Sequence, residues 1–216
     1  MLQLTKITQH FPRPHLADPP ATLAAQIPLL APHIHPGARI GLAVGSRGIT
    51  GLEGLVTAAV SGLKNLGAEP FIIPAMGSHG GATAEGQIQV LASYGITPER
   101  VGAPVLSSMD TVQIEAPGHP TAVYLDRHAW DSDGVVVINR IKPHTDYHGP
   151  YESGLAKICV IGLGKHRQAL AIHSHGVYGL RHLIPPTAER LLASGKIIGG
   201  IGLVENAYDE TMALEV

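Results

Sequence analysis

The chain has 216 residues, of which 44% are hydrophobic and only 15% charged, and its formal net charge is -2 with histidine neutral. This composition is that of a folded globular domain and excludes an intrinsically disordered chain. Without an excess of Lys and Arg, neither nucleic acid nor an anionic membrane is an expected partner. The single Cys159 excludes an internal disulfide, and the first residues lack the apolar run of a signal peptide, so we expect a cytoplasmic protein.

The first half of the chain alternates strands, loops and helices. Residues 1–38 read as a Pro-rich leader segment that packs on the domain, with a weak helical pattern at 21–30. The run 39–44 predicts a strand, and the apolar spacing over 52–66 predicts a helix. A second strand at 71–73 precedes a loop and then a helix from Thr83, whose side chain can cap it, to Gly95. This order is typical of a parallel sheet covered by helices.

The second half continues this pattern. Two strands are expected at 111–116 and 121–125, and the continuous β-branched run 134–139 predicts a strand buried on both faces. Further elements are expected in chain order: a helix at 165–173, a helix from 185–186 to 195 and a strand at 197–204. We therefore expect an α/β, Rossmann-like fold with a mostly parallel sheet, as a catalytic N-terminal domain over 39–216. The sequence stops as if cut within a longer protein, so we expect a C-terminal domain to be absent from it.

Polar side chains follow three of the predicted strands. Arg47 follows the first, His79 follows the second, and His144 and His148 follow the strongest strand. Ligands of open α/β sheets bind at the carboxyl ends of the strands, so these side chains converge on one crevice if the strands are neighbours. There an arginine can hold a carboxylate by two parallel hydrogen bonds, and a histidine flanked by glycines can act as a general base.

Two further residues suggest chemistry downstream. Lys157 lies in a mildly apolar stretch, where a desolvated lysine can become a nucleophile or a covalent anchor, although it could equally extend to the surface. His173 follows a helical run and could bind a metal. The run 161–167 begins like a dinucleotide-binding fingerprint but lacks its third glycine and its later acidic residue. With 13 histidines in the chain, imidazole chemistry is the leading hypothesis.

Taken together, these positions resemble the lactate racemase family that uses a nickel-pincer nucleotide cofactor. The resemblance extends from about Arg39 to Glu205 and rests on an ordered set of segments: Ser46-Arg47, Gly77-Ser78-His79, Lys142-Pro143-His144, Gly154-Leu155-Ala156-Lys157 and Ala171-Ile172-His173. It implies that His79 and His144 are the acid/base pair and that Arg47 holds the substrate carboxylate. It also implies that Lys157 carries the nickel pyridinium-3,5-bisthiocarboxylic acid mononucleotide through a thioamide link, and that His173 completes the nickel coordination.

The implied activity is that of a racemase or epimerase, which moves hydride between a small 2-hydroxy acid and the cofactor. The implied partners are that acid, the absent C-terminal domain, without which the isolated chain can be inactive, and the proteins that synthesise the cofactor. Val44-Gly45-Ser46 replaces an acidic residue expected shortly before the arginine, which indicates an acid other than lactate. The segment from His144 to Lys157 is longer than in the family, which leaves His148 as an alternative second base.

Two other interpretations remain open at this point. The chain could be a non-catalytic module that keeps the fold and holds a nucleotide or a partner domain, in which case it would bind without turnover. It could also be a zinc-dependent hydrolase built on the His-rich segment. His144 and His148 have the helical spacing of two zinc ligands, but Pro143 and Gly149 disfavour a helix there, and no HExxH pattern occurs.

Overall fold

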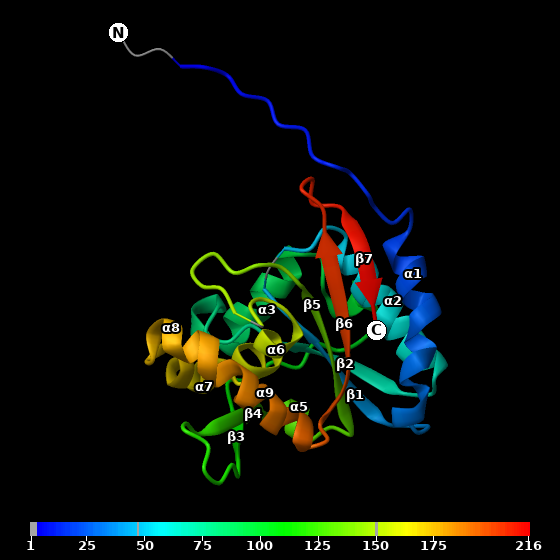
Figure 1. The fold of residues 1–216 in the computed structure, drawn as a ribbon. Coiled ribbons are helices and arrows are strands. Elements are labelled where there is room, and N and C mark those ends of the chain that lie inside the picture. Colours follow the sequence, from blue (N-terminus) through cyan, green and yellow to red (C-terminus); the bar gives the residue numbers. More distant parts are fainter. Residues whose placement is uncertain (1–3, 47, 150) are drawn as a thin grey trace.

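The computed structural model describes residues 4–46, 48–149 and 151–216 (Figure 1). An extended N-terminal arm, residues 4–17, precedes the first helix. The elements in chain order are α1 (Pro19–Gln26), η1 (Ile27–His33), β1 (Arg39–Val44), α2 (Leu52–Asn65), β2 (Glu69–Pro74), η2 (Gly80–Ala82), α3 (Ala84–Ser93), α4 (Pro98–Val101), β3 (Thr111–Ile114), β4 (Val123–Asp126), α5 (Arg127–Trp130), β5 (Gly134–Arg140), α6 (Leu155–Lys157), η3 (Ile158–Gly162), α7 (Lys165–His173), α8 (Gly176–Tyr178), η4 (Gly179–Leu183), α9 (Ile184–Ala193), β6 (Ile197–Glu205) and β7 (Thr211–Glu215).

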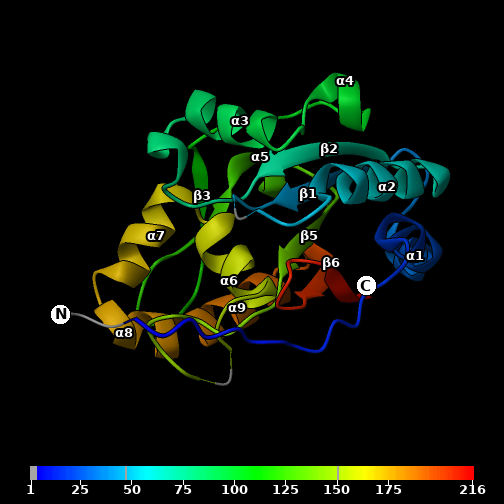
Figure 2. The same cartoon turned by 90° about the horizontal axis from the view of Figure 1, so that it is seen from above.

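The main sheet has the strand order β2-β1-β5-β6-β7. The first four of these strands are parallel, and β7 closes the edge antiparallel to β6. Strands β3 and β4 form a separate antiparallel pair. Helices cover both faces of the main sheet (Figure 2). The predicted α/β fold with a mostly parallel sheet is therefore confirmed.

Side chains of the central strands alternate between two hydrophobic clusters. Leu42 and Val136 face the cluster that includes α1 and α2, whereas Ala43 and Val137 face the cluster that includes η3, η4 and α9. Successive residues of a strand point to opposite faces of a sheet, so a strand that helices cover on both sides must be apolar throughout. The continuous β-branched run of β5 meets this requirement, as its sequence predicted.

The observed elements differ from the predicted ones at the chain ends and in short helices within the chain that the sequence did not predict, among them α4, α5, α6 with η3, and α8 with η4. The weak pattern at 21–30 corresponds to α1 and the 3-10 helix η1, whose buried residues Leu23, Ile27 and Leu30 join the core. The strand β7 was not predicted from the sequence. Thr83 caps α3 as expected, because its side-chain oxygen accepts the backbone N–H of Gly86 at 3.0 Å.

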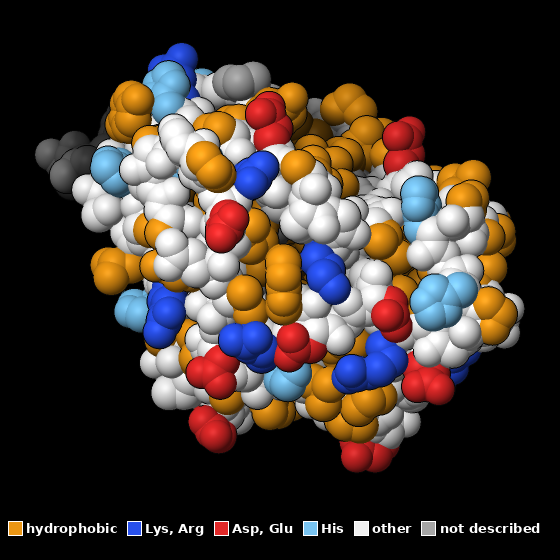
Figure 3. Space-filling model, turned by 90° about the horizontal axis from the view of Figure 1, so that it is seen from below, with side chains coloured by type: hydrophobic (Ala, Val, Ile, Leu, Met, Phe, Trp, Pro, Cys, Tyr) orange, Lys and Arg blue, Asp and Glu red, His pale blue; other side chains and the backbone are white. Residues whose placement is uncertain are grey.

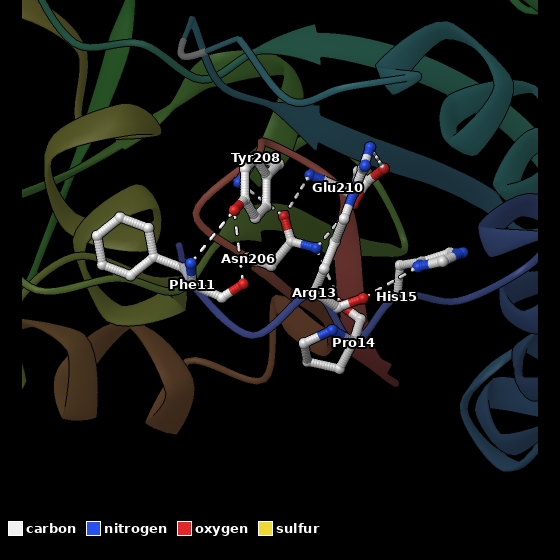
Figure 4. A network of polar contacts seen from close by, with 7 residues as sticks. All are labelled: Phe11, Arg13, Pro14, His15, Asn206, Tyr208 and Glu210. Atoms are coloured by element: carbon white, nitrogen blue, oxygen red, sulfur yellow. Dashed lines mark hydrogen bonds and ion pairs between the residues drawn. The ribbon is translucent and has the colours of Figure 1, made fainter. Parts of the chain in front are cut away.

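The N-terminal arm is tied to the turn between β6 and β7 (Figure 4). Arg13 donates two hydrogen bonds to the carboxylate of Glu210, from Nε at 2.8 Å and from Nη2 at 2.7 Å. The side chain of Asn206 donates to the carbonyl oxygen of Pro14 at 3.0 Å. These contacts join residues almost two hundred positions apart, so the arm is held where it leaves the body of the molecule.

On the face of the molecule drawn in Figure 3, the described residues do not concentrate charge of one sign. Side chains of Lys and Arg are interspersed there with those of Asp and Glu (Figure 3). Within the residues that the structure describes, no helix combines the length and the apolar character needed to cross a bilayer.

Candidate active site

The loops that leave β2, β1 and β5 open at the same edge of the sheet, because these strands are neighbours and parallel. A cavity of about 350 Å³ lies there. Its lining includes side chains that the sequence singled out: His79, His144, Lys157 and His173. Arg47 lies outside the described residues, whereas its neighbour Ser46 lines the cavity. The structure therefore brings together four residues that lie on two separate loops and two separate helices.

His79 lies on the glycine-rich loop between β2 and α3, and its Nδ1 is 2.5 Å from the side-chain oxygen of Ser46. Ser46 is held in turn by Tyr94, whose hydroxyl donates to its carbonyl oxygen at 2.7 Å. When the Nδ1–H of His79 donates to the Ser46 hydroxyl, the lone pair resides on Nε2. Proton acceptance by His79 at Nε2 therefore depends on this contact.

His144 lies on the loop after β5, and only 11% of its side chain is exposed. Its Nδ1 accepts the backbone N–H of Asp146 at 3.1 Å, and its own backbone N–H donates to Glu152 at 2.6 Å. A neutral ring whose Nδ1 accepts a hydrogen bond carries its proton on Nε2. His144 in this state is thus a hydrogen-bond donor at Nε2.

His148, the alternative second base, lies in a different environment. Its side chain is 87% exposed, and its Nδ1 is 3.3 Å from Oε1 of Glu152. Among the residues that the structure describes, those that line the cavity do not include His148. The backbone N–H groups of His144 and Gly149 lower the pKa of the Glu152 carboxyl, which therefore stays ionised and fixes the shape of this loop.

Lys157 and His173 line the cavity from consecutive helical segments. Lys157 ends α6 and is followed directly by the π-helix η3, a rare form that is frequent at functional sites. His173 ends α7. Partial burial lowers the pKa of His173, and the positive charge of Lys157 lowers it further. The neutral imidazole that these effects favour is the form that binds metals.

Two positively charged side chains that line the cavity were not assigned a role from the sequence. Arg140 and Lys142 line it together with Lys157, against the single carboxylate of Asp146 among the described lining residues. Arg140 forms an ion pair with Glu205 at the end of β6. A signal for Arg140 existed in the sequence, since it directly follows the strongest predicted strand, 134–139, at the edge where ligands bind. Because Glu205 neutralises Arg140, Lys142 and Lys157 supply the positive charge of this lining, and they favour an anionic ligand.

The glycines of the weak dinucleotide-like run serve packing. A Cβ added to Gly162 would lie 2.6 Å from the carbonyl oxygen of Ala75, and one added to Gly164 would lie 2.2 Å from Cβ of Gln168. Lys165, next in the run, is fully buried. Close approach of chain segments therefore explains these glycines without a bound phosphate.

The zinc-hydrolase hypothesis lacks a ligand set in the described ranges. They contain no group of three or more His, Cys, Asp or Glu side chains that could hold a metal ion. A catalytic zinc needs three protein ligands. His144 and His148 fail as a pair because no helix forms between them and His148 points into solvent.

Comparisons with known proteins bear on the fold. No family model and no curated protein matches the chain. The chain is similar to a crystal structure of a protein from Thermotoga maritima that was solved as a structural genomics target, with a TM-score of 0.60 and 15% sequence identity. The match covers 90% of this chain and 54% of that chain, so the chain spans about half the length of that protein. This likeness supports the α/β fold that the sheet topology shows.

Proposed function

We propose that this chain is the catalytic-residue-bearing part of an isomerase that racemises or epimerises a small 2-hydroxy acid. The observation that carries the proposal is the shared cavity, because it is lined by four of the five residues that the family resemblance assigns to one reaction: His79, His144, Lys157 and His173. Lys142 also lines the cavity and keeps its positive charge when Lys157 is acylated, which suits a substrate that bears a carboxylate.

The residues present fit a nickel-pincer nucleotide better than a metal held by protein alone. His173 offers one imidazole, and no cluster of three protein ligands exists among the described residues. A metal here would therefore need most of its donors from an organic ligand, which a pincer group provides. Lys157 would hold that group covalently, and His173 would supply one ligand to its nickel. When bound, the group would accept hydride from the α-carbon of the substrate and return it.

The two histidines supply the proton transfers. One imidazole cannot reach the hydroxyl groups of both enantiomers, so racemisation needs two acid/base groups. His79 has a lone pair on Nε2 in the tautomer whose Nδ1–H donates to Ser46, and the contact of neutral His144 with Asp146 favours a proton on Nε2. Nε2 of His79 can take the hydroxyl proton of one enantiomer, and His144, once it has taken a proton from solvent to become imidazolium, can give a proton to the oxygen of the product. The two rings exchange these roles for the other enantiomer.

The proposal is tested with the full chain produced alongside the cofactor-synthesis proteins. We expect intact-mass measurement to show an addition on Lys157, and metal analysis to show stoichiometric nickel. Chiral chromatography of single enantiomers, from lactate to longer and sugar-derived 2-hydroxy acids, should show interconversion. In D₂O the α-hydrogen should be retained, because hydride transfer does not exchange it with solvent, whereas removal as a proton would introduce deuterium.

Matched variants sharpen the test. Lys157→Arg keeps the positive charge but has no amine to acylate, so it should lose both the mass addition and the racemisation. His144→Ala should abolish turnover, whereas His148→Ala, an exposed residue four positions away, should keep it. An unmodified Lys157 together with no nickel would refute the proposal.

A further inference from the structure

A buried ion pair lies behind the loop that carries His79. Lys165, Gln87 and Asp126 are each 0% exposed. The ammonium of Lys165 contacts the carbonyl oxygen of Pro74 at 2.5 Å, Oε1 of Gln87 at 2.9 Å and Oδ2 of Asp126 at 3.2 Å. The ammonium donates hydrogen bonds to the first two of these oxygens, and the Asp126 carboxylate beside it supplies the opposite charge. Burial lowers the pKa of Lys165, and the Asp126 carboxylate opposes that shift.

The backbone at Lys165 indicates that its side chain is needed. Its φ is 55°, in the left-handed region where glycine is normally preferred. A buried ion pair also adds little net stability compared with apolar residues of similar volume. Neither the backbone conformation, which would favour glycine, nor a gain in stability therefore explains a lysine at this position.

Lys165 acts on the His79 loop directly and also through Gln87 of α3. It binds the carbonyl of Pro74, where the loop begins, and it holds the side-chain oxygen of Gln87. With that oxygen engaged, the amide nitrogen of Gln87 faces the loop and donates to the carbonyl oxygens of Gly77 at 2.9 Å and His79 at 3.3 Å. An amide turned the other way would set oxygen against oxygen, so the ammonium fixes the only orientation in which Gln87 binds the loop.

We propose that Lys165 and Gln87 are positioning residues for His79. The ammonium orients the Gln87 amide, and the amide holds the loop so that the imidazole meets the Ser46 hydroxyl in the cavity. This inference rests on the proposed acid/base role of His79. Neither residue lines the cavity among the described residues, so both act through the loop rather than on the substrate.

Two variants separate this role from simple stabilisation. Gln87→Glu keeps an oxygen for Lys165 but cannot donate to the carbonyls of the loop. Lys165→Met combined with Asp126→Asn removes both charges and keeps the oxygen that accepts the backbone N–H of Ala129 at the start of α5. Lys196→Met is the control, because this lysine also donates to a backbone carbonyl, that of Ser132, away from the cavity.

The primary measurement is the imidazole nitrogen NMR spectrum of ¹⁵N-labelled protein between pH 5 and 9, with the His79 signals assigned by His79→Gln. Both test variants should change the tautomer signals and the titration of His79, whereas Lys196→Met should not. In the cofactor-loaded enzyme, kcat should fall by about 10²-fold with KM little changed, the scale expected for a reacting group misplaced by about 1 Å.

A His79 spectrum identical to wild type in either folded test variant would overturn the inference. If Gln87→Glu does not fold, the double variant gives the same decision, because it leaves Gln87 in place. The NMR result does not require turnover. If the wild-type protein shows no racemase activity, the NMR spectra of the variants still decide whether Lys165 and Gln87 position His79.

Discussion

The guanidinium of Arg140 faces two carboxylates that differ in burial, and this contrast allows a quantitative test. The side chain of Glu205 is 3% exposed and pairs with Nη1 of Arg140, whereas that of Asp209 is 81% exposed and lies 3.9 Å from the same nitrogen. Glu205 also accepts the backbone N–H of Thr50 at 2.9 Å, in the loop after β1. It therefore joins the ends of β5 and β6 to a loop beside the cavity.

Glu205→Ala removes two charge-assisted hydrogen bonds, each of which contributes about 1.5–3 kcal/mol. Removing one partner of a fully buried ion pair costs about 3–5 kcal/mol. Since 20% of the Arg140 side chain remains exposed, water offsets part of this loss, and we expect the free energy of unfolding to fall by about 3 kcal/mol. For a chain of this length, that corresponds to a decrease in Tm of about 6–12 °C. Asp209→Ala should cost no more than about 1 kcal/mol, because its exposed pair adds little and the φ of 59° at this residue adds only modest strain with Ala.

Urea unfolding followed by circular dichroism measures both variants under the same conditions. The two variants should share the m value of the wild-type protein, so that their midpoints compare directly. Equal losses of stability in Glu205→Ala and Asp209→Ala would refute the reasoning from burial. So would a loss below about 1 kcal/mol in Glu205→Ala, because that is the range of exposed pairs.

Three further predictions concern other parts of the molecule. Burial raises the pKa of Cys159 to about 12, so Ellman's reagent at pH 8 should react with it only after unfolding, and rapid reaction in the folded protein would contradict its burial. Hydrogen bonds, first from Arg13, lower the pKa of Glu210 to about 2, so their stabilising effect is complete above the ordinary value of 4.5 and disappears as the pH falls toward 2. NMR titration of Arg13→Ala should show this pKa rise, and an unchanged value would exclude the contact. Gly86→Ala should destabilise the protein, because the added Cβ would lie 1.9 Å from the carbonyl oxygen of Gly80 in the His79 loop. Gly54→Ala in α2 is the control: its Cβ would meet nothing nearer than 3.4 Å, so thermal unfolding should show unchanged or higher stability.

The central fold could be predicted from local sequence signals. The branched run of β5 and the cap at Thr83 specify their elements through side-chain shape and a hydrogen bond to the next turn. The strand β7 could not be predicted, because its sequence, TMALE, carries no clear alternation and pairs only along the edge that β6 provides. The strand conformation of β7 therefore depends on its pairing with β6 rather than on its own sequence.

The candidate site was predictable to the extent that topology dictates it. Strand ends that are neighbours in a parallel sheet bring their loops together, so the placement of His79 and His144 beside one cavity follows from chain order. Burial is not visible in a sequence. Lys165 lies in the run that begins like a dinucleotide-binding fingerprint, and Gln87 lies within a predicted helix, so no sequence signal indicated that both are enclosed behind the His79 loop.

The strand order of the main sheet also bears on how the chain folds during synthesis. After β1 and β2 have paired, β5 joins beside β1, β6 joins beside β5 and β7 joins beside β6, always at the same growing side. Each strand that emerges from the ribosome can therefore extend the sheet without displacing an earlier one. Until β7 emerges, a nascent chain presents the unpaired backbone of β6, which is the stage at which a chaperone would protect it from aggregation.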